Sequence, residues 1–307
     1  MWILFAVLSA CLLGFYDVFK KKSLSSNAVI PVLFINTVIC SIFFLPAILG
    51  SSAGIISETD KFYIPSGKLP AHLYVLGKAV LVLSSWICGY FSIKHLPITI
   101  VGPINATRPV MVMIGAMLIF GEKLNLWQWL GVLIAVSAVF MLSSSGKKEG
   151  INFGHNKWIV LLFTGALFGA LSGLYDKFLI ASPTDGGIGL NRYFVQGWYN
   201  VYQAIIMSVF LLLRTTGHFG HLDKFQWRWS IPLISIFLTA ADIAYLYALS
   251  KPGALIAIVS MVRRGSVIVS FTFGAMVFHE KNLKGKFIDL IMVVASMVCL
   301  MIGTLYA

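Results

Sequence analysis

Four charged side chains stand near the middle of long apolar stretches in this 307-residue sequence: Arg108, Asp242, Arg263 and Arg264. A charge at the centre of a membrane-spanning helix costs about 2.5 to 3.5 kcal/mol even on a lenient scale, which marks such residues as candidates for a function. Three of these charges are positive and one is negative. We therefore expect Asp242 to neutralise one arginine, and the surplus positive charge to bind a carboxylate or phosphate group of a small molecule.

The alternative for these four residues is a buried structural network that never touches a ligand, since ion pairs are also retained for specificity of packing. Arg263 and Arg264 are about 100° apart around a helix, so at most one of them points straight into a central cavity. The sequence leaves both interpretations open.

Neighbouring polar and aromatic residues extend the candidate site. Asn105 lies one helical turn before Arg108 and shares its face, and an amide in an apolar environment needs a partner. Trp86 and Tyr90 share a face at i, i+4 spacing, and Tyr245 lies three residues after the aspartate of the charged group. These side chains are candidates for the lining of a ligand site, with ordinary helix packing as the alternative for each aromatic.

The elements that carry these residues are ten apolar blocks, each of about the length that crosses a bilayer as a helix. Five is an odd number of crossings, so a second copy of a five-helix unit enters the membrane from the opposite face and is inverted relative to the first. The predicted fold is an all-α membrane protein of ten transmembrane helices in two inverted five-helix repeats. The repeats span residues 1–145 and 158–307, joined by a connecting loop at 146–157. The apolar blocks are residues 2–19, 28–50, 71–93, 98–120, 126–144, 158–181, 193–213, 230–250, 253–278 and 287–306.

Internal repetition supports this duplication. The pattern Gly-x-Tyr-Asp-x-Phe at residues 14–19 recurs at residues 173–178, an offset of 159. The same offset carries Gly-Ala-Met from residues 115–117 to residues 274–276. Two matches at one offset indicate that the chain is a duplicated unit.

The repeated aspartates, Asp17 and Asp176, lie near the ends of the first and sixth predicted spans, which the inversion directs toward opposite membrane faces. We expect them to act as paired gates, each bonded when its side is closed. The alternative is that they are interfacial carboxylates beside neighbouring lysines. For Glu122 and Glu280, which follow the fourth and ninth spans, we expect a role in capping or anchoring helix ends.

Composition excludes several classes of protein. The chain is 59% hydrophobic and 11% charged, whereas soluble domains average about 25% charged residues. Its net charge of +12 is scattered over short connections without a basic domain, which argues against nucleic acid. Connections after odd-numbered spans hold 13 lysines and arginines, against 6 after even-numbered spans. The positive-inside rule then predicts a multi-pass protein of the plasma (inner) membrane with both termini on the non-cytoplasmic side.

No pattern predicts a metal site, a cofactor or catalysis. The sequence has no HExxH, GxSxG or Walker A motif, and we expect a protein that is not an enzyme. The cysteines stand inside apolar blocks without CxxC spacing, as expected of core residues: Cys11, Cys40, Cys88 and Cys299.

Short motifs flank the fourth and ninth spans. Leu96-Pro97 and Lys251-Pro252-Gly253 precede them, and Gly121-Glu122-Lys123 and His279-Glu280-Lys281 follow them. With the ten spans in two halves, this layout resembles the EamA domain pair of the drug/metabolite transporter superfamily. The resemblance implies a central cavity lined largely by the third, fourth, eighth and ninth helices. The sequence departs from the family at Arg264-Gly265, where the family favours proline on the ninth helix.

Charges and resemblance together predict a secondary transporter, an exporter or permease that moves a small polar or anionic metabolite by alternating access. The alternatives are a passive channel and an integral membrane enzyme. The absence of an ATP-binding loop suggests coupling to a proton or sodium gradient, with Asp242 as the first candidate for a proton site. The lipid bilayer and the small-molecule substrate are the expected partners. The sequence does not decide whether the protein forms a homodimer.

Overall fold

The computed structural model describes residues 2–60, 62–121, 123–181, 183, 186–215, 224–249, 256–280 and 282–306. Within these residues the regular secondary structure is helical, and no strand is present. The helices are α1 (Trp2–Leu24), α2 (Val29–Ser52), α3 (Leu69–His95), α4 (Ile98–Ala106), α5 (Arg108–Phe120), α6 (Leu126–Lys147), α7 (Lys157–Ile180), α8 (Arg192–Thr215), α9 (Ser230–Leu249), α10 (Ile256–Arg264), α11 (Ser266–Phe278) and α12 (Leu283–Leu305).

Two of the predicted blocks are broken helices, so the prediction of one continuous helix in each was wrong. Thr107 separates α4 from α5, and Gly265 separates α10 from α11. The two pieces have 9 and 13 residues in both cases. Pro109 has no N–H to donate and its ring clashes with the carbonyl one turn earlier, which explains the first break. Glycine disfavours the helix interior and accounts for the second.

Eight stretches of the described chain are long and apolar enough to cross a membrane. Their outward surfaces are apolar as well, with Leu4, Leu133 and Phe140 among the exposed side chains. Such a surface suits hydrocarbon rather than water. The eight stretches are α1, α2, α3, Ile98–Gly115, α6, α7, Met261–Phe278 and α12.

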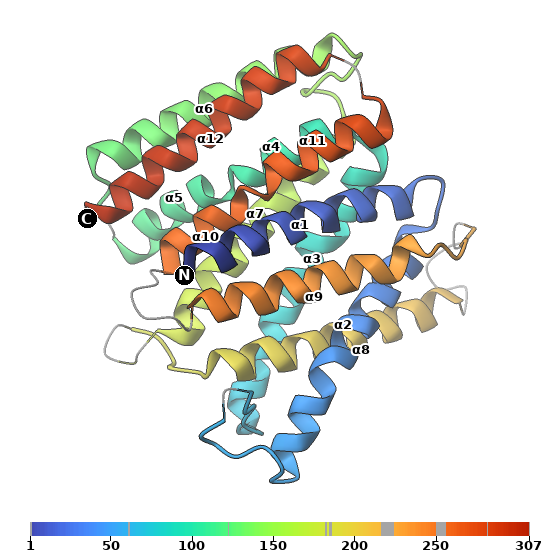
Figure 1. Ribbon diagram of the computed structural model, residues 1–307, viewed down its shortest axis with the longest axis vertical. Helices are drawn as coiled ribbons and strands as arrows, with labels where there is room; N and C mark the ends of the chain where they lie inside the picture. Colours follow the sequence, from blue (N-terminus) through green and yellow to red (C-terminus); the bar gives the residue numbers. More distant parts are fainter. Residues whose placement is uncertain are drawn as a thin grey trace.

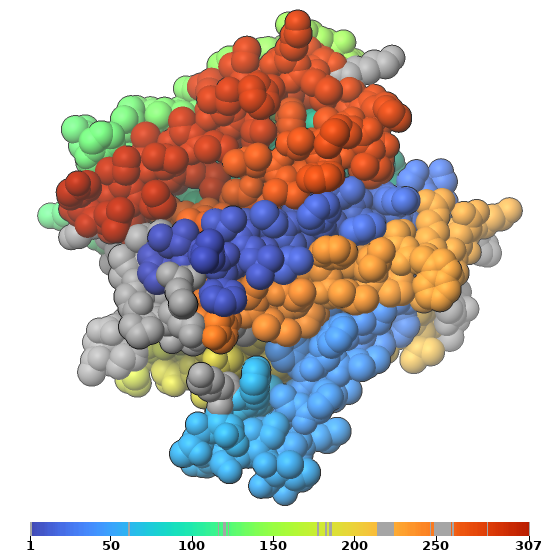
Figure 2. Space-filling view, viewed as in Figure 1, coloured from blue at the N-terminus to red at the C-terminus, as the bar shows by residue number. Residues whose placement is uncertain are grey.

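The helices of the first half pack mainly on helices of the second half. Helix α1 contacts α9 and α11, α7 contacts α3 and α5, and α4 contacts α11. Helix α2 pairs with α8, and α6 with α12 (Figure 1). Figure 2 shows α1 on the surface between α9 and α11. The core is therefore shared between the halves, and both termini lie at the same end of the bundle (Figure 1).

Close helix contacts depend on residues without a side chain. A Cβ atom at Gly14 of α1 would lie 2.5 Å from Cβ of Val269 and 2.9 Å from the carbonyl oxygen of Ser266, both in α11. Small residues let helix backbones approach closely in membranes, where packing and not water drives association. Gly14 thus sets the distance between α1 and α11.

We expect Gly14→Ala to destabilise the protein by about 1 to 3 kcal/mol, because the added methyl group overpacks the contact of α1 with α11. The measurement is the midpoint of thermal unfolding in detergent. Gly89→Ala is the matched control, since a Cβ atom at Gly89 in α3 meets nothing within 4 Å. Equal midpoints for the two variants would contradict this account of the contact.

Candidate functional site

The three arginines of the charged group flank the two helix breaks. Arg108 is the first residue of α5, and Arg263 and Arg264 are the last two residues of α10. Arg264 lies within electrostatic range of both other arginines. The structure therefore brings Arg108 near two arginines that follow it by about 155 residues in the sequence, and Asp242 of α9 lies beside Arg263.

Asp242 is the partner of Arg263. One carboxylate oxygen forms an ion pair with Nη2 of Arg263, and the other accepts a hydrogen bond from Nε2 of Gln196 at 3.3 Å. The two ion-paired side chains are only 18% and 14% exposed. The guanidinium group of Arg263 also lies 4.8 Å from the ring centroid of Tyr245, in cation–π geometry. Arg263 is thus neutralised and held in place by α9.

Arg108 is held by α3 and α7 without a carboxylate. Its Nη2 lies 3.4 Å from Oγ of Ser85, and its Nε atom is buried without a hydrogen-bond partner. The flat guanidinium packs on Gly169 of α7, where a Cβ atom would lie 2.7 Å from Nη1. Glycine at this position therefore leaves room for the arginine side chain.

The remaining predicted lining residues occupy different surroundings. Asn105 is near the end of α4, and its Oδ1 atom is buried without a hydrogen-bond partner. Trp86 packs against the largest buried apolar cluster. Tyr90 belongs to that cluster and lies near the ammonium group of Lys20, 5.5 Å from its ring centroid. Of the predicted lining residues, Tyr245 is the one with direct contact to a charged residue of the group.

The two repeated aspartates each bind a lysine. Oδ1 of Asp17 lies 2.6 Å from Nζ of Lys20 in the same helix. Oδ1 of Asp176 lies 2.6 Å from Nζ of Lys78 in α3, and that ammonium lies 4.6 Å from the ring centroid of Tyr199 in α8. The sequence analysis assigned no role to Lys78. Its position inside an apolar block could have marked it as a candidate for a buried ion pair. Its partner depended on the packing of α7 against α3.

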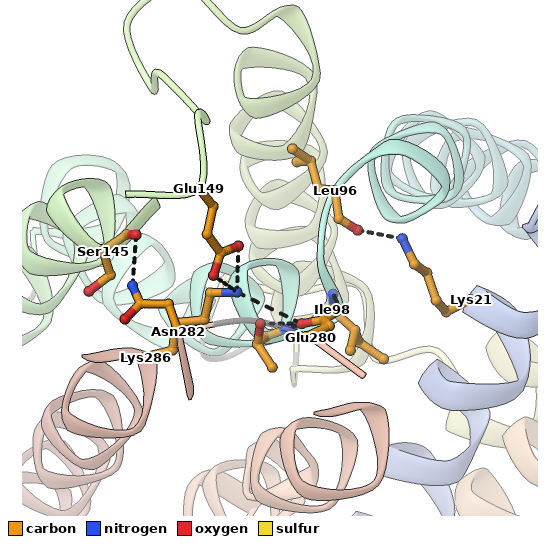
Figure 3. A network of polar contacts seen from close by, with 9 residues as sticks. Lys21, Leu96, Ile98, Ser145, Glu149, Glu280, Asn282 and Lys286 are labelled. Carbon is orange, nitrogen blue, oxygen red and sulfur yellow. Dashed lines mark hydrogen bonds and ion pairs between the residues drawn. The ribbon is translucent and has the colours of Figure 1, made fainter. Parts of the chain in front are cut away.

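A polar network ties several helices together at one end of the bundle (Figure 3). The carboxylate of Glu280, just after α11, accepts hydrogen bonds from the backbone N–H groups of Ile98 (2.6 Å) and Thr99 (3.1 Å). It also accepts a bond from the hydroxyl of Thr99. The prediction that Glu280 caps a helix is confirmed, and the helix is α4. Glu122, the corresponding residue of the first half, lies outside the described residues, as do Lys251, Pro252 and Gly253.

Lys286 of α12 completes this network. Its side chain is fully buried, and Nζ lies 2.8 Å from Oε1 of Glu149 and 4.0 Å from Oε2 of Glu280. Figure 3 shows the ammonium between the two carboxylates. Lys21 of α1 adds hydrogen bonds of 2.6 Å from Nζ to the carbonyl oxygens of Ile93 and Leu96, at the end of α3. Lys21, bonded to the end of α3, and Glu280, bonded to the start of α4, thus fix the turn between these two helices.

Hydrogen bonds link several helix ends here. Lys21 joins the end of α1 to the α3–α4 connection, and Asn27, between α1 and α2, donates to the carbonyl of Gln226 before α9. Glu280, after α11, accepts from the start of α4, and Asn282, before α12, donates to the carbonyl of Ser145 in α6. Basic residues of these segments, Lys21 and Lys286 among them, therefore gather on one side of the molecule.

Other kinds of site find less support in the described residues. No group of three or more His, Cys, Asp or Glu side chains is placed there to hold a metal ion. A groove of about 490 Å³ is apolar and includes none of the charged residues. It is lined by Met111, Phe153, Ile159, Val160, Phe163, Thr164 and Leu167.

Comparison with known proteins shows similarity to transporters. Residues 1–144 match the EamA-like transporter family. An "Uncharacterized transporter in cobO 3'region" of Sinorhizobium sp is 28% identical over 144 residues, which are 46% of this chain and 96% of the relative. An "Uncharacterized transporter" of Archaeoglobus fulgidus is 24% identical over 147 residues, which are 48% of this chain and 49% of the relative. The match therefore spans about half the length of the archaeal relative.

A crystal structure of another protein shares the fold over nearly the whole chain. It covers 95% of this chain and 96% of its own, with a TM-score of 0.55 and 15% identity. The apolar helices indicate a multi-pass integral membrane protein, and both of these relatives are named as transporters. The family match covers residues 1–144, a little under half of the chain.

Asp242→Asn should destabilise the protein by about 3 to 5 kcal/mol, because it leaves Arg263 buried without its counter-charge. Combining it with Arg263→Gln should recover part of that loss, since the double variant buries no unpaired charge. Thermal unfolding of the two single variants and the double variant in detergent measures the coupling. Additive losses would show that the two residues do not stabilise each other.

Proposed function

We propose that the protein is a secondary transporter, an exporter or permease that moves a small polar or anionic metabolite by alternating access. The observation that carries the proposal is the gathering of Arg108, Arg263 and Arg264 at two helix breaks. Discontinuous helices near the bilayer midplane are a device by which transporters bind polar substrates away from water. Such charges are costly in a membrane and are kept where a substrate or ion passes.

The scaffold of this transporter consists of ten spans in two inverted repeats, with α4–α5 and α10–α11 each counted as one span. The helix bounds support this, because the break at Thr107 is followed 158 residues later by the break at Gly265. The packing supports it too. Exchanging the halves turns the contact of α1 with α9 into that of α7 with α3, and the contact of α1 with α11 into that of α7 with α5.

The network around Lys286 serves as the closed gate of one side. The positive-inside rule assigns this basic end to the cytoplasm, which places both termini on the non-cytoplasmic side of a plasma (inner) membrane. Asp17 and Asp176 lie near the ends of α1 and α7, and each acts as a gate through its ion pair with a lysine. Opening then exchanges these internal bonds for water.

The substrate contacts in this mechanism come from Arg108 and Arg264, with Asn105, Tyr245, Trp86 and Tyr90 along the path. Asp242 and Arg263 form the switchable pair. Asp242 is the candidate coupling residue, for a proton or a sodium ion.

Lys286→Met should loosen the closed end, because it removes the cation that lies between Glu149 and Glu280. The readout is the rate at which a charged, membrane-impermeant thiol reagent labels Ile104→Cys in a background without native cysteines. Labelling should rise several-fold relative to the parent. Lys284→Met is the matched control, since Lys284 lies on the exposed face of the same helix. Equal rates in both variants would remove Lys286 from the gate.

Flux into proteoliposomes tests the function itself, with a panel of organic acids, phosphate esters, amino acids and neutral sugars. A transporter gives saturable uptake and counterflow of at least one polar or anionic solute. Arg108→Gln and Arg264→Gln should each lower that uptake by about tenfold or more, the loss of one charge-assisted contact. Arg192→Gln, at the start of α8, should leave it unchanged. Non-saturating flux without counterflow would identify a channel, and conversion of the solute would identify an enzyme.

A further inference from the structure

Two arginines near the helix breaks have no carboxylate partner. Asp242 neutralises Arg263, whereas Asp17 and Asp176 are each bonded to a lysine at 2.6 Å. In the described chain, neither Arg108 nor Arg264 has a carboxylate within ion-pair distance. The Asp17 carboxylate acts on both arginines at longer range, but its own partner is Lys20. The local surplus is two positive charges.

The first of these arginines has donors to spare. A guanidinium group carries five N–H donors. Arg108 uses one on Ser85 at the long distance of 3.4 Å, and the Ser85 hydroxyl itself donates to the carbonyl of Gly165 at 2.7 Å. The Nε atom has no partner although it is buried. Arg108 is also the first residue of α5, where the positive end of the helix dipole favours an anion.

The second arginine, Arg264, ends α10 at the other break and lies within electrostatic range of Arg108. Two like charges in a poorly solvated interior repel each other, and each is costly unless an anion compensates it. A monoanion would leave one of them unbalanced. A dianion balances both, and each guanidinium can bind two oxygens of a carboxylate or phosphate side by side.

A buried acceptor near this pair points to a donor on the ligand. Oδ1 of Asn105, one turn before Arg108, has no hydrogen-bond partner. An unpaired buried acceptor is costly, and a ligand hydroxyl would satisfy it.

We propose that the substrate is a small hydroxylated dianion bound between Arg108 and Arg264, with its hydroxyl donating to Asn105. Phosphate monoesters and dicarboxylates share this chemistry. That this ligand is a transported substrate rests on the transporter function proposed above. The binding site itself is argued from the charges alone.

The test is equilibrium binding to the purified full-length protein in detergent at pH 7.5. The probes are glycerol 3-phosphate and malate as hydroxylated dianions, lactate as a hydroxylated monoanion, and glycerol as a neutral control. At least one dianion should bind about 100-fold more tightly than lactate, the value of one further charge-assisted contact of about 3 kcal/mol. Lowering the pH to 5.5 should weaken a phosphate ester several-fold, because its second pKa is about 6, and leave malate nearly unchanged.

Variants locate the bound dianion. Arg108→Gln and Arg264→Gln should each abolish the preference for dianions over lactate, whereas Arg192→Gln keeps it. If either glutamine variant fails to fold, the corresponding Arg→Lys variant replaces it. Lysine keeps the charge and loses the paired donors, so dianion binding should weaken about tenfold and remain above that of lactate.

Two outcomes would overturn the proposal: lactate binding as tightly as both dianions, or dianion binding that ignores both arginines. The proteoliposome assay separates this failure from failure of the function. Saturable uptake of a neutral or cationic solute, with no dianion bound, would sink the dianion site and keep the transporter. Dianion binding without counterflow would keep the site and reject transport.

Discussion

A hydrocarbon layer offers no water to a backbone N–H or C=O group, so a chain that crosses it must satisfy these groups itself. In this protein the constraint is met almost entirely by helices, and it becomes most demanding where a helix is interrupted. At Thr107 and Gly265 the chain changes to shorter-range bonds, from Thr107 N–H to the Ile104 carbonyl and from Gly265 N–H to the Val262 carbonyl. These bonds satisfy the backbone N–H groups at the breaks, and the breaks place Arg108, Arg263 and Arg264 at helix ends.

The same constraint governs the charged side chains. Asp17, Asp176 and Asp242 each lie against a cation, and the pairs of Asp176 and Asp242 each join two packed helices. Arg108 and Arg264 are the exception, since they lie within electrostatic range of each other and neither has a carboxylate at ion-pair distance among the described residues. An arrangement that leaves two cations unpaired is poor for stability alone. It becomes understandable if the missing negative charges belong to a ligand that binds and dissociates.

The polar contacts at the helix ends differ between the two halves of the chain, although short sequence motifs recur in both. At one end Glu280 caps α4, Lys21 caps α3, and Lys286 holds two carboxylates. The offset that carries Glu122 to Glu280 carries Gln128 to Lys286, so the first half has no equivalent buried lysine. Gln128 instead forms a capping box with Asn125 at the start of α6. The corresponding helix ends of the two halves are therefore held by different polar contacts.

The sequence by itself determined the class of protein, because the length and apolarity of each block are local properties that no neighbour can change. It also determined the recurrence of short motifs and the position of Arg108, Asp242, Arg263 and Arg264 inside apolar stretches. It could not determine that α4 and α5 separate at Thr107. Nor could it determine which cation each carboxylate meets. The choice of Arg263 for Asp242, of Lys78 for Asp176 and of the α4 N-terminus for Glu280 depends on which helices become neighbours. A polar contact acts over about 3 Å, so only the tertiary packing of helices far apart in the chain could decide these partners.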